Sequence, residues 1–123
     1  MACWLRGDQT TVYEFNVAGG VPPGCMPVVV CRYTAQEMLR LTTYLASWPT
    51  GGVPRPWLVL MRDAPLPPPR PARFRRRALG ARVLGVTEVP YLVPLRSVDS
   101  PEEGLTFRVV AQAAVRLRRD LGL

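Results

Sequence analysis

The sequence of 123 residues contains no histidine, and reading it residue by residue finds no lysine, so all 16 basic side chains are arginines. A Walker-type phosphate-binding loop needs a lysine that reaches the terminal phosphates, and a Schiff-base enzyme needs a lysine amine. The lack of histidine excludes an imidazole general base and the commonest zinc ligand. What remains is carboxylate or cysteine chemistry, or binding without catalysis.

Long apolar runs are also missing. The longest ones, residues 26–31 and 57–61, are soon interrupted by arginine, far short of the roughly 18 to 20 residues that span a bilayer. Residues 1–6 have neither a basic n-region nor an apolar h-region, so we expect no signal peptide. We therefore predict a cytoplasmic protein without a membrane span.

Cysteine is scarce, and the three present, Cys3, Cys25 and Cys31, show no C-x-x-C spacing. An odd number without such spacing indicates reduced structural thiols rather than a disulfide framework. Carboxylates alone are a poor complement to soft thiolates, so we expect no metal site.

The residues that are present favour one folded domain. With 48% hydrophobic and 20% charged residues, a chain of this length can bury a core. We predict a single α/β domain over residues 1–123, with 1–10 as an N-terminal extension and 63–71 as a proline-rich spacer. The net charge of +7 is compatible with an acidic partner, although the arginine bias is also typical of a high-GC genome.

The first half of the sequence predicts four elements in the order strand, strand, helix, strand. Residues 11–17 alternate apolar and polar side chains, which indicates a strand, and residues 26–31 are apolar on both faces, as in a central parallel strand. Thr34 followed by Glu37 has the capping-box spacing of a helix start, and residues 56–61 read as a buried strand. The apolar stripe of the helix consists of Met38, Leu41, Leu45 and Trp48. Because only about nine residues separate the first two strands, they form either a hairpin or non-adjacent strands joined by a tight loop.

The second half predicts further alternation. Five prolines in residues 63–71 favour polyproline II, a helix follows over 72–79 with Gly80 as its left-handed C-cap, and a strand follows over 83–91. A final helix is expected over 105–121, its acidic start and basic end matching the helix dipole. The pattern predicts an α/β fold of two or three layers, with a mostly parallel sheet of about four strands and three helices.

The order of these blocks resembles a known family. Residues 28–34, a helix, residues 57–63 and the triplet Val89-Pro90-Tyr91 are similar to the carboxyl-terminal half of MinD/ParA-type (deviant Walker) P-loop ATPases, in the divergent form common in actinobacteria. The resemblance spans about residues 13–123.

The same resemblance implies that the ATP machinery is lacking. The family's phosphate loop and lysine have no counterpart here, and Asn16 stands near the position of an aspartate that serves magnesium. Asparagine lacks the charge that a magnesium site needs. We therefore expect a protein that is not an enzyme, binds no cofactor, and associates with a partner protein or with copies of itself through a sheet edge. A truncated piece of a longer ATPase is a further interpretation.

The densest charge lies in and beside the predicted helix of residues 72–79. Its members are Arg70, Arg73, Arg75, Arg76, Arg77 and Arg82. Arginine forks match phosphate oxygens, so an arginine-rich nucleic-acid-binding protein is the alternative function, weighed against a plain solvated helix face. Such binding should depend steeply on salt with little base preference, because only tryptophan and tyrosine residues elsewhere can stack on bases.

A second candidate site lies at the end of the strand over residues 56–61. Arg62 and Asp63 stand where open α/β sheets place ligands, so a residual ligand contact is one interpretation. A strand-end ion pair or a turn cap is the other.

Overall fold

The computed structural model describes residues 2–5, 25–49, 53–96 and 98–123. The chain divides into two compact units, one made of residues 15–88 and the other of residues 1–14 together with 89–123. The predicted strand over residues 11–17 lies outside the described residues.

Three strands form a parallel sheet, namely β1 (Val28–Arg32), β2 (Trp57–Met61) and β3 (Gly85–Val89). Their order is β1-β2-β3, and the register of the first pair runs from Val28 opposite Trp57 to Arg32 opposite Met61. The α/β fold with a parallel sheet is confirmed, but the described sheet has three strands and not four. Within the described residues, β1 is therefore an edge strand.

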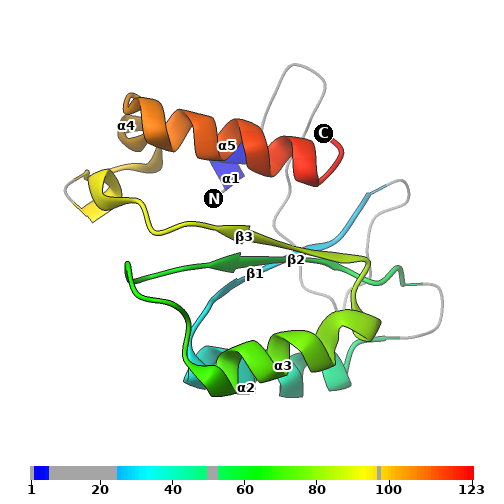
Figure 1. The fold of residues 1–123 in the computed structure, drawn as a ribbon. Helices are drawn as coiled ribbons and strands as arrows, with labels where there is room; N and C mark the ends of the chain where they lie inside the picture. The colour runs from blue at the N-terminus through cyan, green and yellow to red at the C-terminus, as the bar shows by residue number, and fades with distance from the viewer. Residues whose placement is uncertain (1, 6–24, 50–52, 97) are drawn as a thin grey trace. The chain divides into compact units, whose positions relative to one another are not determined.

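Helices α2 (Ala35–Ala46) and α3 (Arg70–Leu79) lie on the same face of this sheet (Figure 1). Helix α2 begins as the capping spacing predicts, because the Thr34 hydroxyl oxygen accepts a hydrogen bond of 3.3 Å from the backbone N–H of Glu37. The strand, helix and strand of this part are the expected parallel βαβ unit.

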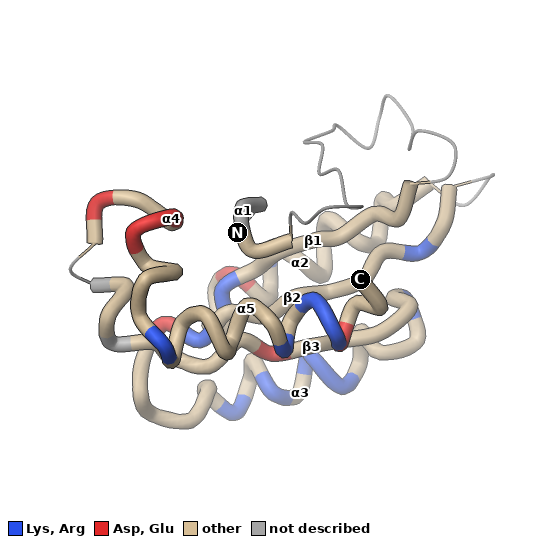
Figure 2. The backbone as a smooth tube through the Cα atoms, turned by 90° about the horizontal axis from the view of Figure 1, so that it is seen from above, with Lys and Arg blue, Asp and Glu red and all other residues tan. Residues whose placement is uncertain are grey.

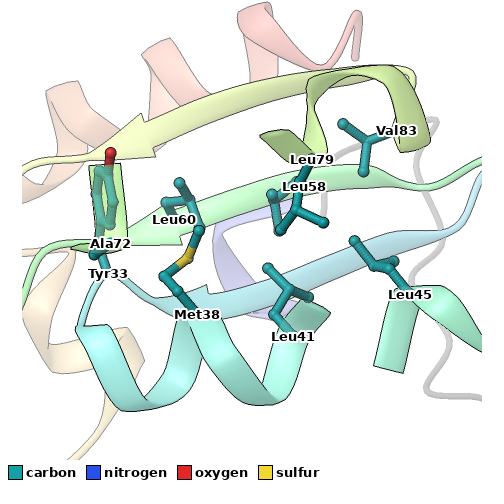
Figure 3. Packing of buried hydrophobic residues seen from close by; sticks show 9 residues of the cluster. All are labelled: Tyr33, Met38, Leu41, Leu45, Leu58, Leu60, Ala72, Leu79 and Val83. Atoms are coloured by element: carbon teal, nitrogen blue, oxygen red, sulfur yellow. The ribbon is translucent and has the colours of Figure 1, made fainter. Parts of the chain in front are cut away.

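A single apolar cluster fills the space between the two helices and the sheet. Met38 and Leu41 of α2 point toward Leu58 and Leu60 of β2 (Figure 3). Burying an apolar side chain of this size fully stabilises the fold by about 1.5–3 kcal/mol. The cluster consists of Tyr33, Met38, Leu41, Leu45, Leu58, Leu60, Ala72, Leu79 and Val83.

The other face of the sheet carries the alternate residues of β2, because successive side chains of a strand point to opposite faces. Trp57 belongs to this face, and its indole lies over Gly85 in the neighbouring strand β3. A Cβ atom added at Gly85 would lie 2.3 Å from Cζ3 of Trp57. The glycine is therefore required by the close approach of the ring.

The end of α3 differs from the prediction. Gly80 is not a left-handed cap: its φ of −55° and ψ of −30° are right-handed, because the chain continues into the 3₁₀ turn η2 (Gly80–Arg82). Strand β3 ends directly before Pro90, as expected for a residue that cannot donate to a ladder.

The unit of residues 1–14 and 89–123 contains α1 (Ala2–Leu5), the 3₁₀ turn η3 (Val93–Arg96), α4 (Pro101–Gly104) and α5 (Arg108–Asp120). Helices α1 and α5 are in contact, and the Arg118 guanidinium donates a hydrogen bond to the Leu5 carbonyl. The buried stripe of α5 consists of Val110, Ala114 and Leu117.

The prediction of one helix over residues 105–121 was wrong at its start. Ser100 caps the separate short helix α4, accepting a hydrogen bond of 3.1 Å from the Glu103 N–H. The Thr106 hydroxyl then donates to the Glu103 carbonyl at 2.7 Å, offering that carbonyl a partner in place of a continued helix. The acidic residues therefore lie in the first turn of α4, and the first turn of α5 has none.

Among the described residues, no helix has both the length and the apolar character needed to cross a bilayer.

Candidate binding sites at the sheet edge and on helix α3

An open groove of about 600 Å³ lies between the edge strand β1 and helix α2. We call it the edge groove, and the lining residues that matter below are Val30, Cys31, Arg32, Glu37, Arg40 and Tyr44. Tyr44 of α2 is 43% exposed in this groove. Val30 also lines it, but its side chain, which is 42% exposed, lies on the sheet face opposite to α2, because Val29 and Cys31 on either side of it pack against the α2 cluster. The groove thus offers apolar surface directly beside strand backbone.

The hydrogen bonds of β1 show which backbone groups point away from the sheet. Pro27 accepts from the Trp57 N–H at 2.9 Å, and the Tyr33 N–H donates to the Met61 carbonyl at 2.8 Å. In a parallel pair, both polar groups of every second residue point toward one neighbour, so those of Val28 and Val30 point to the opposite side, as does the Arg32 N–H. The Arg32 carbonyl is already engaged, because it accepts hydrogen bonds from the Thr34 N–H at 3.0 Å and from the Cys31 thiol at 3.2 Å. Within the described part of the chain, no strand pairs with that side.

The charges around the edge groove are mixed but mostly basic. Arg40 and Glu37, one helical turn apart on α2, form an ion pair of 3.3 Å that is largely exposed. Arg32, at the end of β1, is exposed as well. Two guanidinium groups and one carboxylate leave this groove with a net positive charge.

Cys31 lies in the edge groove as a free thiol. Burial raises its pKa from 9.0 to about 11, and the nearby Glu37 carboxylate contributes to the increase. At neutral pH the side chain is therefore a protonated thiol, which is a weak nucleophile. The pKa makes Cys31 unsuited to nucleophilic catalysis and consistent with the predicted structural role.

The structure separates the six arginines predicted as one phosphate-binding group. Arg70, Arg73 and Arg77 are exposed on α3, whereas Arg75 and Arg76 are half-buried. Arg76 forms an ion pair of 3.1 Å with Glu88 of β3. Arg82 lies beyond the helix, exposed in the turn η2. Three arginines therefore share the exposed side of α3, which carries no acidic residue (Figure 2).

One residue of this exposed side was missed in the sequence. Phe74 is 73% exposed, although aromatic side chains of this size are usually at least half-buried. Its position is four residues after Arg70 and three before Arg77, opposite the buried Ala72 and Leu79. This helical spacing was the available signal, and it contradicts the expectation that no aromatic residue accompanies the arginines.

The pair at the end of β2 serves the local chain. The Arg62 guanidinium donates a hydrogen bond of 2.6 Å to the Leu66 carbonyl and a longer one of 3.5 Å to the Pro65 carbonyl. Asp63 is exposed. Arg62 thus braces the start of the proline-rich segment, an arrangement that favours the turn-cap interpretation over a ligand contact.

No cluster of three or more cysteine or carboxylate side chains suited to a metal ion occurs in the described residues. No protein-family profile, curated protein or solved structure matches this chain. The two surfaces described above are therefore interpreted from their own chemistry.

Proposed function

We propose that this chain is a non-catalytic protein that binds an extended segment of a partner protein along β1. The segment adds a strand to the sheet beyond β1, and its alternate side chains enter the edge groove. The observation that carries this proposal is the coincidence of outward-facing strand backbone with an accessible apolar groove beside it. Recognition by strand addition uses these two features together, main-chain hydrogen bonds for affinity and pockets for specificity.

The charge of the chain selects the kind of partner. Each chain carries a net charge of +7, so two copies repel one another. The exposed Arg32 at the edge groove attracts an acidic segment, whereas Arg40 is already paired with Glu37. The occupant is therefore an extended partner segment in which apolar residues alternate with glutamate or aspartate, and a second copy of the chain is the competing occupant.

The absence of lysine and histidine supports the non-catalytic part of the proposal, as does the protonated thiol of Cys31. We further propose that the chain corresponds to the second half of a MinD/ParA-type domain without its phosphate loop. The parallel arrangement of β1, α2 and β2 supports this correspondence.

The test is a titration of the full chain with fluorescent ten-residue peptides that alternate valine with glutamate, or valine with arginine. Fluorescence anisotropy should show binding of the glutamate peptide and not of the arginine peptide. Val30→Pro removes an N–H that faces away from β2, so it should abolish binding while β1 still pairs with β2. Val30→Thr keeps that N–H and a β-branched side chain, and should bind as the unchanged chain does.

Three results would contradict the proposal. Equal binding of both peptides would show that the groove does not select an acidic segment. Binding that persists in a folded Val30→Pro variant would show that the peptide does not pair along β1. Light scattering that gives a dimer for the unchanged chain, and a monomer for Val30→Pro, would assign the edge to a second copy.

A further inference from the structure

We propose that the outward face of α3 binds single-stranded nucleic acid, with a base stacked on Phe74 and phosphates held by Arg70, Arg73 and Arg77. We call these four residues the α3 face. The inference concerns a different element from the edge groove and does not depend on the proposed function.

The first step is the geometry of the helix. Residues three and four apart are neighbours on a helix surface, so Arg70, Arg73, Phe74 and Arg77 form one continuous group. The opposite side of α3 is already engaged, because Ala72 and Leu79 belong to the apolar cluster (Figure 3). The α3 face is thus held outward by the packing of the other side.

The second step is the charge of the helix itself. Like charges three and four residues apart destabilise a helix, and so do cations in its first turn, where the dipole is positive. Helix α3 has both, with Arg70 and Arg73 near its start and no acidic residue along its length. A polyanion bound to this face relieves the repulsion, since it brings negative charge to the positive end of the dipole.

The third step is the aromatic ring. An isolated exposed apolar residue needs no explanation, but Phe74 shares one side of α3 with three arginines, at positions three or four residues from Arg70 and Arg77 and next to Arg73. Proteins that bind single strands combine a basic surface that follows the phosphates with aromatic rings on which bases stack. A paired duplex keeps its bases stacked inside, so the ring favours a single strand.

A membrane surface is the competing acidic partner. Helices that lie on membranes insert a broad apolar face opposite a basic one. In α3 the apolar face is packed against the cluster, and Phe74 is the one large apolar residue on the outward side. This arrangement favours nucleic acid over a lipid surface.

The experiment measures binding of the full chain to a fluorescent twelve-residue oligothymidylate at several salt concentrations. A duplex of equal length and vesicles of phosphatidylserine with phosphatidylcholine serve as competitors. We expect Phe74→Ala to weaken binding by about 5- to 150-fold, the range measured for loss of one stacked base. Phe74→Trp should retain binding. Arg77→Gln should lower the slope of log affinity against log salt by about 0.7, the value for one phosphate contact on a single strand.

Two control variants distinguish binding at the α3 face from non-specific binding by charge or by exposed apolar side chains. Phe107→Ala removes an exposed phenylalanine outside α3, which is 41% exposed. Arg75→Gln removes the same charge from a half-buried position of α3. Both should bind the oligonucleotide as the unchanged chain does.

The inference is overturned if the chain shows no salt-dependent binding to the oligonucleotide. It is equally overturned if Phe107→Ala and Arg75→Gln reduce the affinity as much as Phe74→Ala and Arg77→Gln do. Tighter binding to the duplex would assign the face to double strands, and displacement by vesicles at lower concentration would assign it to a lipid surface.

Discussion

Replacing Gly85 by alanine tests the packing of the sheet at one contact. The added Cβ atom would lie 2.3 Å, 2.6 Å and 2.9 Å from three ring carbons of Trp57. Ordinary contacts of this kind begin at 3.4 Å, so the indole must retreat by more than an ångström. Trp57 belongs to the central strand β2, which has a strand on each side, so its backbone cannot shift aside and the indole itself must change its side-chain conformation.

The expected cost follows from two opposing effects. Overpacking a well-filled site costs about 1–3 kcal/mol. Alanine also restricts the unfolded chain, which returns about 0.4–1 kcal/mol. A net loss of about 1–2 kcal/mol in the free energy of unfolding corresponds to a fall in Tm of about 4–8 °C for a chain of this size. Calorimetry or circular dichroism during heating measures the shift.

The matched control is Gly80→Ala. Nothing lies within 4 Å of a Cβ atom added there, and the right-handed backbone accepts any residue, so this variant should be neutral or more stable. Trp57→Leu removes the ring, and in that background Gly85→Ala should cost nothing. An unchanged Tm for Gly85→Ala, or the same loss with and without the ring, would refute the argument.

Two further predictions concern α2 and the edge groove. Thr34→Ala should cost about 1 kcal/mol in urea unfolding, because the N–H of Glu37 loses its hydroxyl acceptor, whereas Thr34→Ser should restore most of it. Alkylation of Cys31 by iodoacetamide should become fast only as the pH approaches about 11, and a midpoint near 9.0 would contradict burial of the thiol. Because the fold raises this pKa, its stabilising effect is present below pH 9.0 and is lost as the pH rises toward 11, a dependence that Cys31→Val should remove.

The parts of the fold that the sequence predicted are those with local physical signals. The Thr34 and Glu37 spacing located the start of α2, and continuous apolar runs located β1 and β2. Gly80 was misassigned because a glycine after a helix is compatible with either hand, and only the continuation into η2 decides between them. Likewise, the sequence could not show that Thr106 offers a side-chain alternative at the break before α5.

The candidate sites were predicted less well, for a different reason. Six arginines close in sequence do not share one direction on a helix, so counting them concealed the ion pair of Arg76 with Glu88. Arg62 was placed correctly at a strand end, but its partners are carbonyls of the following segment. The edge groove had no local signal at all, because it exists only once β1 and α2 are packed together.

The register of the sheet also constrains the order in which the chain can fold. Every residue of β1 finds its partner in β2 29 positions later, from Val28 with Trp57 onward. Such non-local pairs form slowly because the intervening loop must close first, whereas a helix such as α2 forms from local contacts within about a microsecond. During synthesis, the valine run of residues 28–30 therefore leaves the ribosome before its partner strand β2 has been translated. A segment of this kind is prone to intermolecular β-pairing until its partner arrives, so slower or colder expression should raise the yield of folded chain.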